Sequence, residues 1–365
     1  MSGGVDSSVV AGLMKEAGHE VVGVTMCFSI SHPNNKKPSC CGVDGINDAK
    51  RAAQILDIPH YVLDFAKDIN DHIIENFMSE YLSGRTPNPC VKCNQHLKFG
   101  SLYHKVMDMG AEALATGHYG KIEYNEKTRN YELKKAKDPR KDQSYFLYSM
   151  KKDTLPHVLF PLGDMTKQEV RSHARRLGLN TAEKPESQDI CFVPDGGYQQ
   201  FLESRLGKEI FAAGEYKNEK GEVVGTHKGI AYYTIGQRER LGIALGRPVY
   251  VYKIEKETNT VYVGSESMLY SNGLCASNFN PVSIDMPTEP MELNVRIRYN
   301  APEVKGTLHY LSDGRVRVDF PEPQKSVTPG QSVVFYNGDV VLAGAIIDKA
   351  IRCEETAPSQ VSFEG

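Results

Sequence analysis

The chain has 365 residues, a formal net charge of −3, 40% hydrophobic residues and 24% charged residues. These values predict a globular protein of two or three domains, and they exclude one that coats nucleic acid through overall positive charge. No apolar run approaches the roughly 18 residues of a membrane helix, and no secretory signal opens the sequence. We therefore expect a cytoplasmic protein without membrane contact, whose eight cysteines are thiols, redox groups or metal ligands.

The first half of the chain alternates helical and strand patterns. Apolar spacing predicts helices over 7–18, 47–56 and 68–82, and β-rich apolar runs predict strands over 21–27, 60–65 and 112–116. A hairpin is expected over 121–136, and Thr166 with Glu169 form a capping box that opens a helix ending at Gly178. Such alternation predicts an α/β domain with a parallel sheet that helices cover on both faces.

The second half of the chain is rich in Gly, Val, Thr and Tyr, with turn sequences between β-rich runs. It therefore predicts two β-rich domains, the last of them a β-barrel. The proline-containing stretch 277–290 is the expected joint between them. The predicted division is 1–204 for the α/β catalytic domain, 205–275 for the central domain, 276–352 for the barrel and 353–365 for a disordered tail.

A glycine-rich loop opens the chain directly before the first predicted helix. It consists of Ser2, Gly3, Gly4, Val5, Asp6, Ser7 and Ser8. The glycines allow close approach of the backbone, and the helix N-terminus offers unpaired N–H groups and a positive dipole end, which suit pyrophosphate. The loop is not a Walker A motif, because no Gly-Lys-Ser/Thr follows. The alternative is a glycine-rich turn in which Asp6 or Ser7 is an ordinary N-cap.

The position of this loop is unusual for the predicted fold. In an α/β sheet such a loop follows a central strand, but only Met1 precedes it here. We expect either that the chain starts further upstream or that the first strand has been lost, with weaker ATP binding or lower stability as the result.

The cysteines at 90, 93 and 191 are open to three interpretations. Cys90 and Cys93 lie in a stretch with two prolines, which predicts a stiff loop ahead of a helix from about Leu97. Structural zinc is disfavoured, since four ligands in two pairs are usual and Cys40 and Cys41 are adjacent. Buried unreactive thiols are the second interpretation. The third is a reactive pair that exchanges sulfur, with Lys92 and the helix N-terminus favouring thiolate.

The combination of these features resembles the family of tRNA-specific 2-thiouridylases (MnmA) within the PP-loop ATP pyrophosphatases, over nearly the whole chain. Further similar strings are Ala115–Tyr119, Lys141–Phe146, Gly225–Gly229, Tyr233–Arg238 and Val295–Tyr299. The resemblance implies an N-terminal PP-loop domain related to adenine nucleotide alpha hydrolases. It also implies an ATP-dependent transferase that adenylates the 2-carbonyl of the tRNA wobble uridine (position 34) and replaces its oxygen by sulfur.

The resemblance assigns roles to individual residues. The glycine-rich loop, with Met26 and Gly117, would bind ATP with Mg²⁺. Cys93, which precedes Asn94, would be the nucleophile, and Cys191 would carry a persulfide supplied by a persulfide relay protein or a cysteine desulfurase. A disulfide between Cys93 and Cys191 would release the product.

One position departs from the family pattern. Many relatives carry Asp where this chain has Cys90. An alternative sulfur route therefore remains, in which Cys90, Cys93 and Cys191 hold a [4Fe–4S] cluster with one open iron.

The prediction of tRNA contact rests on local charge and on the resemblance. Residues 121–152 contain ten Lys or Arg against five Asp or Glu, although one such run is often only a solvated face. The resemblance places further contacts around a flipped base or along the tRNA. These residues are Asn88, Pro89, Cys90, His118, Lys141, Asp142, Gln143, Arg298, Tyr299 and Gln331.

Two rival functions remain open at this stage. One is another PP-loop enzyme, either an amidotransferase-coupled synthetase or a different tRNA thiolase. The other is a catalytically impaired tRNA-binding protein. Pyrophosphate release that depends on tRNA, together with formation of 2-thiouridine, would separate these rivals from the thiouridylase.

Overall fold

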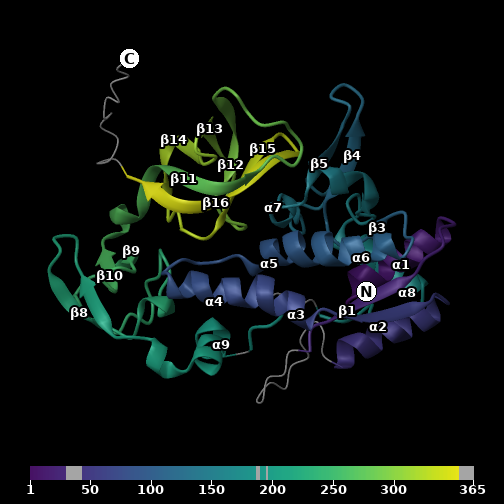
Figure 1. The fold of residues 1–365 in the computed structure, drawn as a ribbon, viewed down its shortest axis with the longest axis horizontal. Coiled ribbons are helices and arrows are strands. Elements are labelled where there is room, and N and C mark those ends of the chain that lie inside the picture. The colour runs from purple at the N-terminus through teal and green to yellow at the C-terminus, as the bar shows by residue number, and fades with distance from the viewer. Residues whose placement is uncertain (30–42, 186–189, 195, 353–365) are drawn as a thin grey trace.

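The computed structural model describes residues 1–29, 43–185, 190–194 and 196–352. The predicted tail over 353–365 lies outside these residues, as do Cys40, Cys41 and Cys353. Figure 1 shows the barrel above the long helices of the first half, with the middle strands at one end of the molecule.

The first part of the chain is mainly helical. Its helices are α1 (Val5–Glu16), α2 (Val43–Ile55), α3 (Ala66–Ile69), η1 (Asn70–Ile74), α4 (Glu75–Leu82), α5 (Pro89–Lys92), η2 (Cys93–Leu102), α6 (Tyr103–Asp108), α7 (Ser144–Leu147), η3 (Lys152–His157), α8 (Lys167–Arg176) and α9 (Gly197–Leu206). Its strands are β1 (Gly23–Cys27), β2 (His60–Asp64), β3 (Leu114–Ala115), β4 (Lys121–Asn125), β5 (Asn130–Lys134) and β6 (Val158–Leu159). These bounds confirm the predicted helices, strands and hairpin to within a few residues.

The expected parallel pairing is present in two separate sheets of the described residues. β1 pairs with β2, and β3 pairs with β6, which was not predicted. The amino group of Met1 donates to Val24 O and the Thr25 hydroxyl donates to Met1 O, so the first residue runs beside β1. The capping box of α8 is confirmed, because Thr166 and Glu169 bond each other's backbone N–H.

The predicted cysteine loop is wrong. The helical segment begins at Pro89 and runs through α5, η2 and α6 to Asp108, so Cys90 and Cys93 lie in its first turns. The physical cause is local. Asn88 is the N-cap, whose side chain accepts from Val91 N at 3.4 Å, and Pro89 occupies the first helical position, where proline is favoured. We call residues 89–108 the cysteine helix.

The second half contains the two expected β-rich parts. The middle strands are β7 (Gly214–Lys217), β8 (Val223–His227), β9 (Tyr250–Glu255) and β10 (Thr260–Gly264), with short helices η4 (Lys208–Ile210) and η5 (Ile230–Tyr232). After η6 (Glu266–Leu269) come β11 (Tyr270–Asn280), β12 (Met291–Arg296), β13 (Val304–Tyr310), β14 (Val316–Lys325), β15 (Ser332–Asn337) and β16 (Val340–Ile351). The sheet order β11-β14-β13-β12-β15-β16 closes through β11–β16 pairing and forms a six-stranded barrel.

The expected joint at 277–290 is wrong in position. β11 pairs with β14 from Tyr270 and with β16 from Gly273, so Ser277 lies inside the barrel. Pro281 follows the last residue of β11, and it therefore marks the end of a strand rather than a change of domain.

The barrel is attached firmly to the first part of the chain. The hairpin β4–β5 extends the barrel sheet, because Lys134 and Leu133 pair with Val340 and Val341 of β16. One hydrophobic cluster also joins the two parts, with Tyr145 and Leu147 packed beside Tyr336. Among the described residues, no helix has the length and apolar character that a bilayer crossing requires.

Candidate active site

The glycine-rich loop wraps the N-terminus of α1. Gly4 is the N-cap, and no side chain caps the helix, which excludes Asp6 or Ser7 as the cap. Gly3 has φ +70°, and a Cβ there would lie 2.2 Å from Gly45 O, so only glycine fits. Among the residues that the structure describes, no side chain caps the first N–H groups of α1, which suits an anion site.

The side chains of the loop face different ways. Val5 and Ser8 are buried, and the Ser8 hydroxyl bonds Gly4 O at 2.9 Å. Ser2 and Ser7 are more accessible and their hydroxyls lie 3.1 Å apart. Ser8 thus stabilises the helix, whereas Ser2 and Ser7 remain at the surface of the loop.

Asp6 is the charged centre of this loop. Its Oδ1 accepts from Lys167 Nζ at 2.7 Å and from the Tyr119 hydroxyl at 2.9 Å. Lys167 begins α8, and its side chain is only 12% exposed. Gln143 holds Tyr119 in turn, because the Gln143 side-chain Oε1 accepts from Tyr119 N and the Gln143 backbone N–H donates to Tyr119 O. A partly buried cation therefore lies beside the loop.

Gly117 brings the end of β3 against the same loop. A Cβ at Gly117 would lie 2.9 Å from Asp6 Cβ and from Ser7 N, so a side chain would push the two apart. Met26, on β1, packs instead against the hydrophobic cluster that contains Phe77. Gly117 is therefore brought to the loop by direct contact, whereas Met26 contributes to the core below it.

His118 bridges β3 and the cysteine helix. Its Nε2 lies 3.1 Å from Lys98 Nζ and its Nδ1 lies 2.8 Å from the Thr116 hydroxyl. Because an ammonium only donates, Nε2 accepts and Nδ1–H donates. Burial lowers the pKa of His118 well below its usual range, and the charge on Lys98 lowers this pKa further. His118 is therefore a neutral acceptor that holds Lys98.

The two cysteines of the cysteine helix differ in exposure. Cys90 is exposed, and Cys93 is half-buried and packs against the cluster around Phe77. Both lie in the first turns of the cysteine helix. From Cys93 the helix continues as a π-helix to Leu102, a rare conformation that is frequent at functional sites.

Cys191 reaches the same hydrophobic cluster from a distant part of the sequence. The neighbouring Phe192 anchors it, since this ring packs edge-on against Phe77 with 5.2 Å between centroids. The structure thus brings Cys93 and Cys191 to one cluster. All cysteines in the described part of the chain are thiols.

A metal does not fit the three cysteines. Within the described residues, which include Cys90, Cys93 and Cys191, no three His, Cys, Asp or Glu side chains are grouped to hold one. The exposed Cys90 and the packed Cys93 and Cys191 therefore do not form the donor set that a cluster with three cysteine ligands needs.

Several predicted tRNA contacts face the protein. Asp142 is 5% exposed and accepts from Ala136 N, Ser144 N and the Ser144 hydroxyl. Gln331 donates from Nε2 to Thr86 O at 2.9 Å and to Pro87 O at 3.3 Å. These side chains, like that of Gln143, form hydrogen bonds with other segments of the protein that lie beside them.

Arg298 and Tyr299 follow β12 at the barrel. Arg298 donates to Lys325 O at 3.0 Å, and its buried Nε has no hydrogen-bond partner in the described structure. Burial lowers the pKa of Arg298. The Tyr299 ring lies 4.5 Å from that of Phe146.

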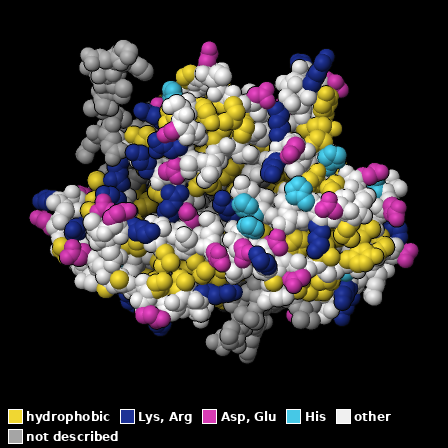
Figure 2. Space-filling model, in the orientation of Figure 1, with side chains coloured by type: hydrophobic (Ala, Val, Ile, Leu, Met, Phe, Trp, Pro, Cys, Tyr) yellow, Lys and Arg dark blue, Asp and Glu magenta, His cyan; other side chains and the backbone are white. Residues whose placement is uncertain are grey.

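The basic stretch 121–152 is less basic in space than in sequence. Acidic groups pair with Lys121, Lys134, Lys135, Lys137, Arg140 and Lys152. Some of these partners, such as Glu303 and Asp285, come from the barrel. Figure 2 shows Lys and Arg side chains gathered instead beneath the barrel, toward β9 and α5.

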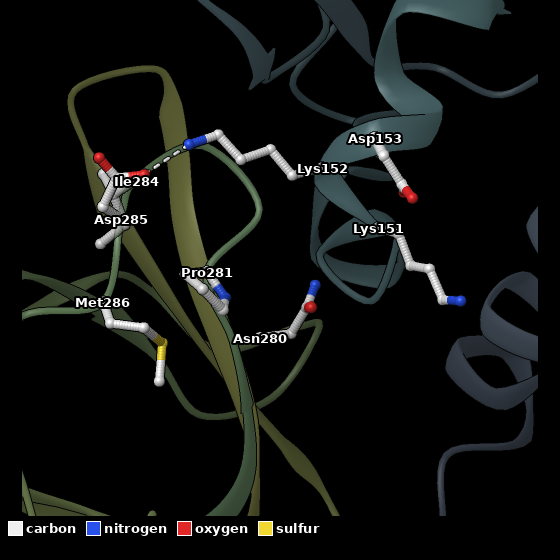
Figure 3. Close-up of a pocket in the computed structure, with 8 residues that line it drawn as sticks. All are labelled: Lys151, Lys152, Asp153, Asn280, Pro281, Ile284, Asp285 and Met286. Carbon is white, nitrogen blue, oxygen red and sulfur yellow. Dashed lines mark hydrogen bonds and ion pairs between the residues drawn. The ribbon is translucent and has the colours of Figure 1, made fainter.

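Two recesses flank the barrel. An open groove of about 420 Å³ lies between η3 and the turn after β11, where Lys152 bonds Asp285 at 2.7 Å (Figure 3). In the same view Lys151 extends away from this pair. A smaller cleft of about 80 Å³ is lined by Asn88, Lys92 and Gly330. Only the smaller cleft touches a predicted site residue.

Sequence reasoning missed three side chains at the site. Lys167 adjoins the capping box, Lys98 lies five residues after Cys93, and Tyr119 lies in a similar string without an assigned role. The π-helix places Lys98 about one turn beyond Cys93, because its hydrogen bonds join residues five apart. The available signal was proximity to a motif, which does not reveal a contact across the fold.

Three family models match the chain, described as the tRNA methyl transferase HUP domain over residues 1–195, the tRNA methyl transferase PRC-barrel domain over 199–265 and the aminomethyltransferase beta-barrel domain over 271–347. The fold and the loop thus define a HUP-domain protein of the PP-loop superfamily, followed by two β-rich domains.

Curated relatives narrow this class. The tRNA-specific 2-thiouridylase MnmA of Acetivibrio thermocellus is 47% identical over 95% of this chain and 97% of its own. MnmA 1 of Caldanaerobacter subterraneus subsp. tengcongensis is 47% identical over 96% and 97%, and MnmA of Carboxydothermus hydrogenoformans is 46% identical over the same shares. The chain belongs to the MnmA family of tRNA-specific 2-thiouridylases.

Proposed function

We propose that this chain is an ATP-dependent tRNA 2-thiouridylase, a sulfurtransferase that converts the wobble uridine of tRNA to 2-thiouridine. The observation that carries the proposal is the joint placement of Cys93 and Cys191 on one cluster, together with an uncapped PP-loop helix nearby in the same domain. Near-full-length identity to MnmA proteins supports it. The rival of a catalytically impaired tRNA-binding protein lacks support, because the PP loop and both cysteines are intact.

The nucleotide site would use the residues around α1. The free N–H groups at the helix N-terminus would bind phosphate oxygens, and Ser2 and Ser7 would add hydroxyl donors. Lys167 adds a positive charge. A Mg²⁺ ion is usually held by one or two carboxylates and by substrate phosphates, and Asp6 fits as its carboxylate.

The chemistry would proceed in two stages. The uridine 2-oxygen attacks the α-phosphorus of ATP, and pyrophosphate leaves. The terminal sulfur of a persulfide on Cys191 then attacks C2, and AMP departs with the former 2-oxygen. The Cys93 thiolate attacks Sγ of Cys191, which releases 2-thiouridine and forms a Cys93–Cys191 disulfide. A reductant and a sulfur-donor protein must restore the thiol and the persulfide.

The persulfide route is preferred to an iron–sulfur cluster. The three cysteines do not form a metal-binding group, and Cys90 lies exposed beside Asn88 and Pro89, where we place the flipped base. His118, Lys141, Arg298 and Tyr299 remain our predictions for tRNA contact. A cytoplasmic location and the domain limits after residues 204 and 352 remain predictions too, whereas a limit after residue 275 would cut strand β11 of the barrel.

The test is a thiolation assay with purified protein, ATP, Mg²⁺, a persulfide donor and tRNA. We expect pyrophosphate release that depends on tRNA, and 2-thiouridine at the wobble position of the product. Pyrophosphate release without 2-thiouridine would show adenylation without sulfur transfer, and the absence of both would refute the proposed activity. Full activity in colourless, iron-free protein would exclude the cluster.

A further inference from the structure

The residues that lead into the cysteine helix, 84–88, contact both β-rich parts of the chain. Thr86 Oγ1 lies 3.3 Å from Thr234 Oγ1 of the middle part. A Cβ at Gly84, which has φ +68°, would lie 2.5 Å from a methyl carbon of Ile254. Arg85 forms ion pairs with Glu80 at 2.7 Å and with Asp348 of β16 at 3.6 Å. The 84–88 segment is therefore fixed from outside its own domain.

The contacts nearest the cysteine helix come from the turn before β15. Thr86 N–H donates to Pro329 O at 2.9 Å. The Gln331 amide donates to Thr86 O at 2.9 Å and to Pro87 O at 3.3 Å. A side-chain amide has two donor hydrogens, and each of the two carbonyls takes one. Asn88, the N-cap of the cysteine helix, follows immediately.

The backbone of this turn is shaped for the same contact. Gly330 has φ +89°, and a Cβ there would lie 2.9 Å from Thr86 N and Thr86 O. The turn and the 84–88 segment therefore approach backbone to backbone at Thr86, where a side chain at position 330 would not fit.

We propose that Gln331 is a positioning residue for the sulfur-transfer site, through which the barrel fixes the start of the cysteine helix and hence the location of Cys93. The proposal rests on the proposed function for its catalytic consequence. The resemblance assigns Gln331 to tRNA contact, and the structure shows its amide N–H groups bonded to Thr86 O and Pro87 O inside the protein. In this proposal its effect on the reaction acts through Thr86, Pro87 and Asn88.

The experiment compares Gln331→Leu with Gln324→Leu. Gln324 is the matched control, because it lies on barrel strand β14 and its amide donates to Glu322 O, two residues away. Hydrogen exchange is measured on protein without tRNA or ATP, and kcat and KM are measured in the thiolation assay. Gln331→Asn, which keeps an amide but shortens its reach, is the second variant if Gln331→Leu does not fold.

We expect the backbone amides of Asn88 and of residues 90–93, since Pro89 has no N–H, to exchange about five- to tenfold faster in Gln331→Leu, as loss of a partly buried hydrogen bond implies. We expect kcat to fall by a similar factor with an unchanged KM for tRNA, and Gln324→Leu to match the wild type. Unchanged exchange overturns the proposal, and so does a raised KM at constant kcat, which would make Gln331 a tRNA contact. Exchange needs no turnover, so it separates this proposal from failure of the thiouridylase activity.

Discussion

The PP loop and the cysteine helix are positioned in opposite ways. The PP loop contacts Gly45, Gly117, Tyr119 and Lys167, all of which belong to the first part of the chain. The cysteine helix is held at its start by Gln331 and Gly330 of the barrel. Nucleotide binding is thus built locally, whereas sulfur transfer depends on the relative placement of all three parts. Changes in the barrel should therefore separate the two activities.

Replacement of either thiol of the proposed reaction tests the contrast between the PP loop and the cysteine helix most strongly. Cys93→Ala or Cys191→Ala should reduce thiolation by about a thousandfold or more, because each thiol makes or breaks a bond in the proposed reaction. ATP affinity should not change. Mass spectrometry of nucleosides from the product tRNA measures the effect, and Cys275→Ala, in barrel strand β11, is the control. Robust formation of 2-thiouridine by Cys93→Ala would refute the step in which the Cys93 thiolate attacks Sγ of Cys191.

A methyl group added at Gly330 should disturb the contact between the barrel and the 84–88 segment, and not the PP loop. Gly330→Ala should lower the free energy of unfolding by about 1–3 kcal/mol, since φ is +89° and the new Cβ meets Thr86. Gly338→Ala is the control, with φ +58° and open space around its Cβ. Denaturant titration should show the larger loss for Gly330→Ala. Equal losses would mean that the close contact contributes nothing beyond backbone strain.

A change at Lys167 should affect ATP binding and leave the cysteine helix unchanged. Lys167→Met should weaken ATP binding by about tenfold, because a charge-assisted contact is lost beside the PP loop. The control is Lys137→Met, whose ammonium pairs with Glu169 at 3.7 Å. Calorimetric titration with ATP measures the affinity, and exchange at residues 88–93 should stay as in the wild type. Unchanged ATP affinity would mean that Lys167 acts only as a structural partner of Asp6.

The smallest expected effect concerns pH. Burial lowers the pKa of His118 below its unfolded value, so both states are neutral at high pH and only the unfolded state takes up the proton near pH 6.5. Stability should therefore fall as pH drops below about 6.5, with a slope of up to roughly 1.4 kcal/mol per pH unit. His118→Gln should flatten this slope in unfolding measured from pH 7.5 to 5. An unchanged slope would mean that other histidines cause it.

Local features were predictable from sequence, and contacts across the fold were not. The helix at Val5–Glu16 and the capping box at Thr166 follow from spacing and side-chain chemistry within one turn. Asn88 and Pro89 are also a local signal, that of a helix start, although the two prolines were interpreted as a stiff loop. The roles of Gln331 and Lys167 depend on partners far away in the chain. Charge counting over 121–152 overstated the unpaired positive charge for the same reason, because Glu303 and Asp285 lie outside that window.

The hydrogen bonds between Gln331 and Thr86 also bear on how the protein matures during synthesis. Their donor and acceptor are 245 residues apart, and Arg85 reaches Ile347, 262 residues away. Contacts of such separation form late, because the intervening chain must be complete. A ribosome-bound chain would therefore fold its PP loop well before its cysteine helix is secured. Synthesis of the last strand, β16, would then complete the sulfur-transfer site, so that unfinished chains bind nucleotide without thiolating tRNA.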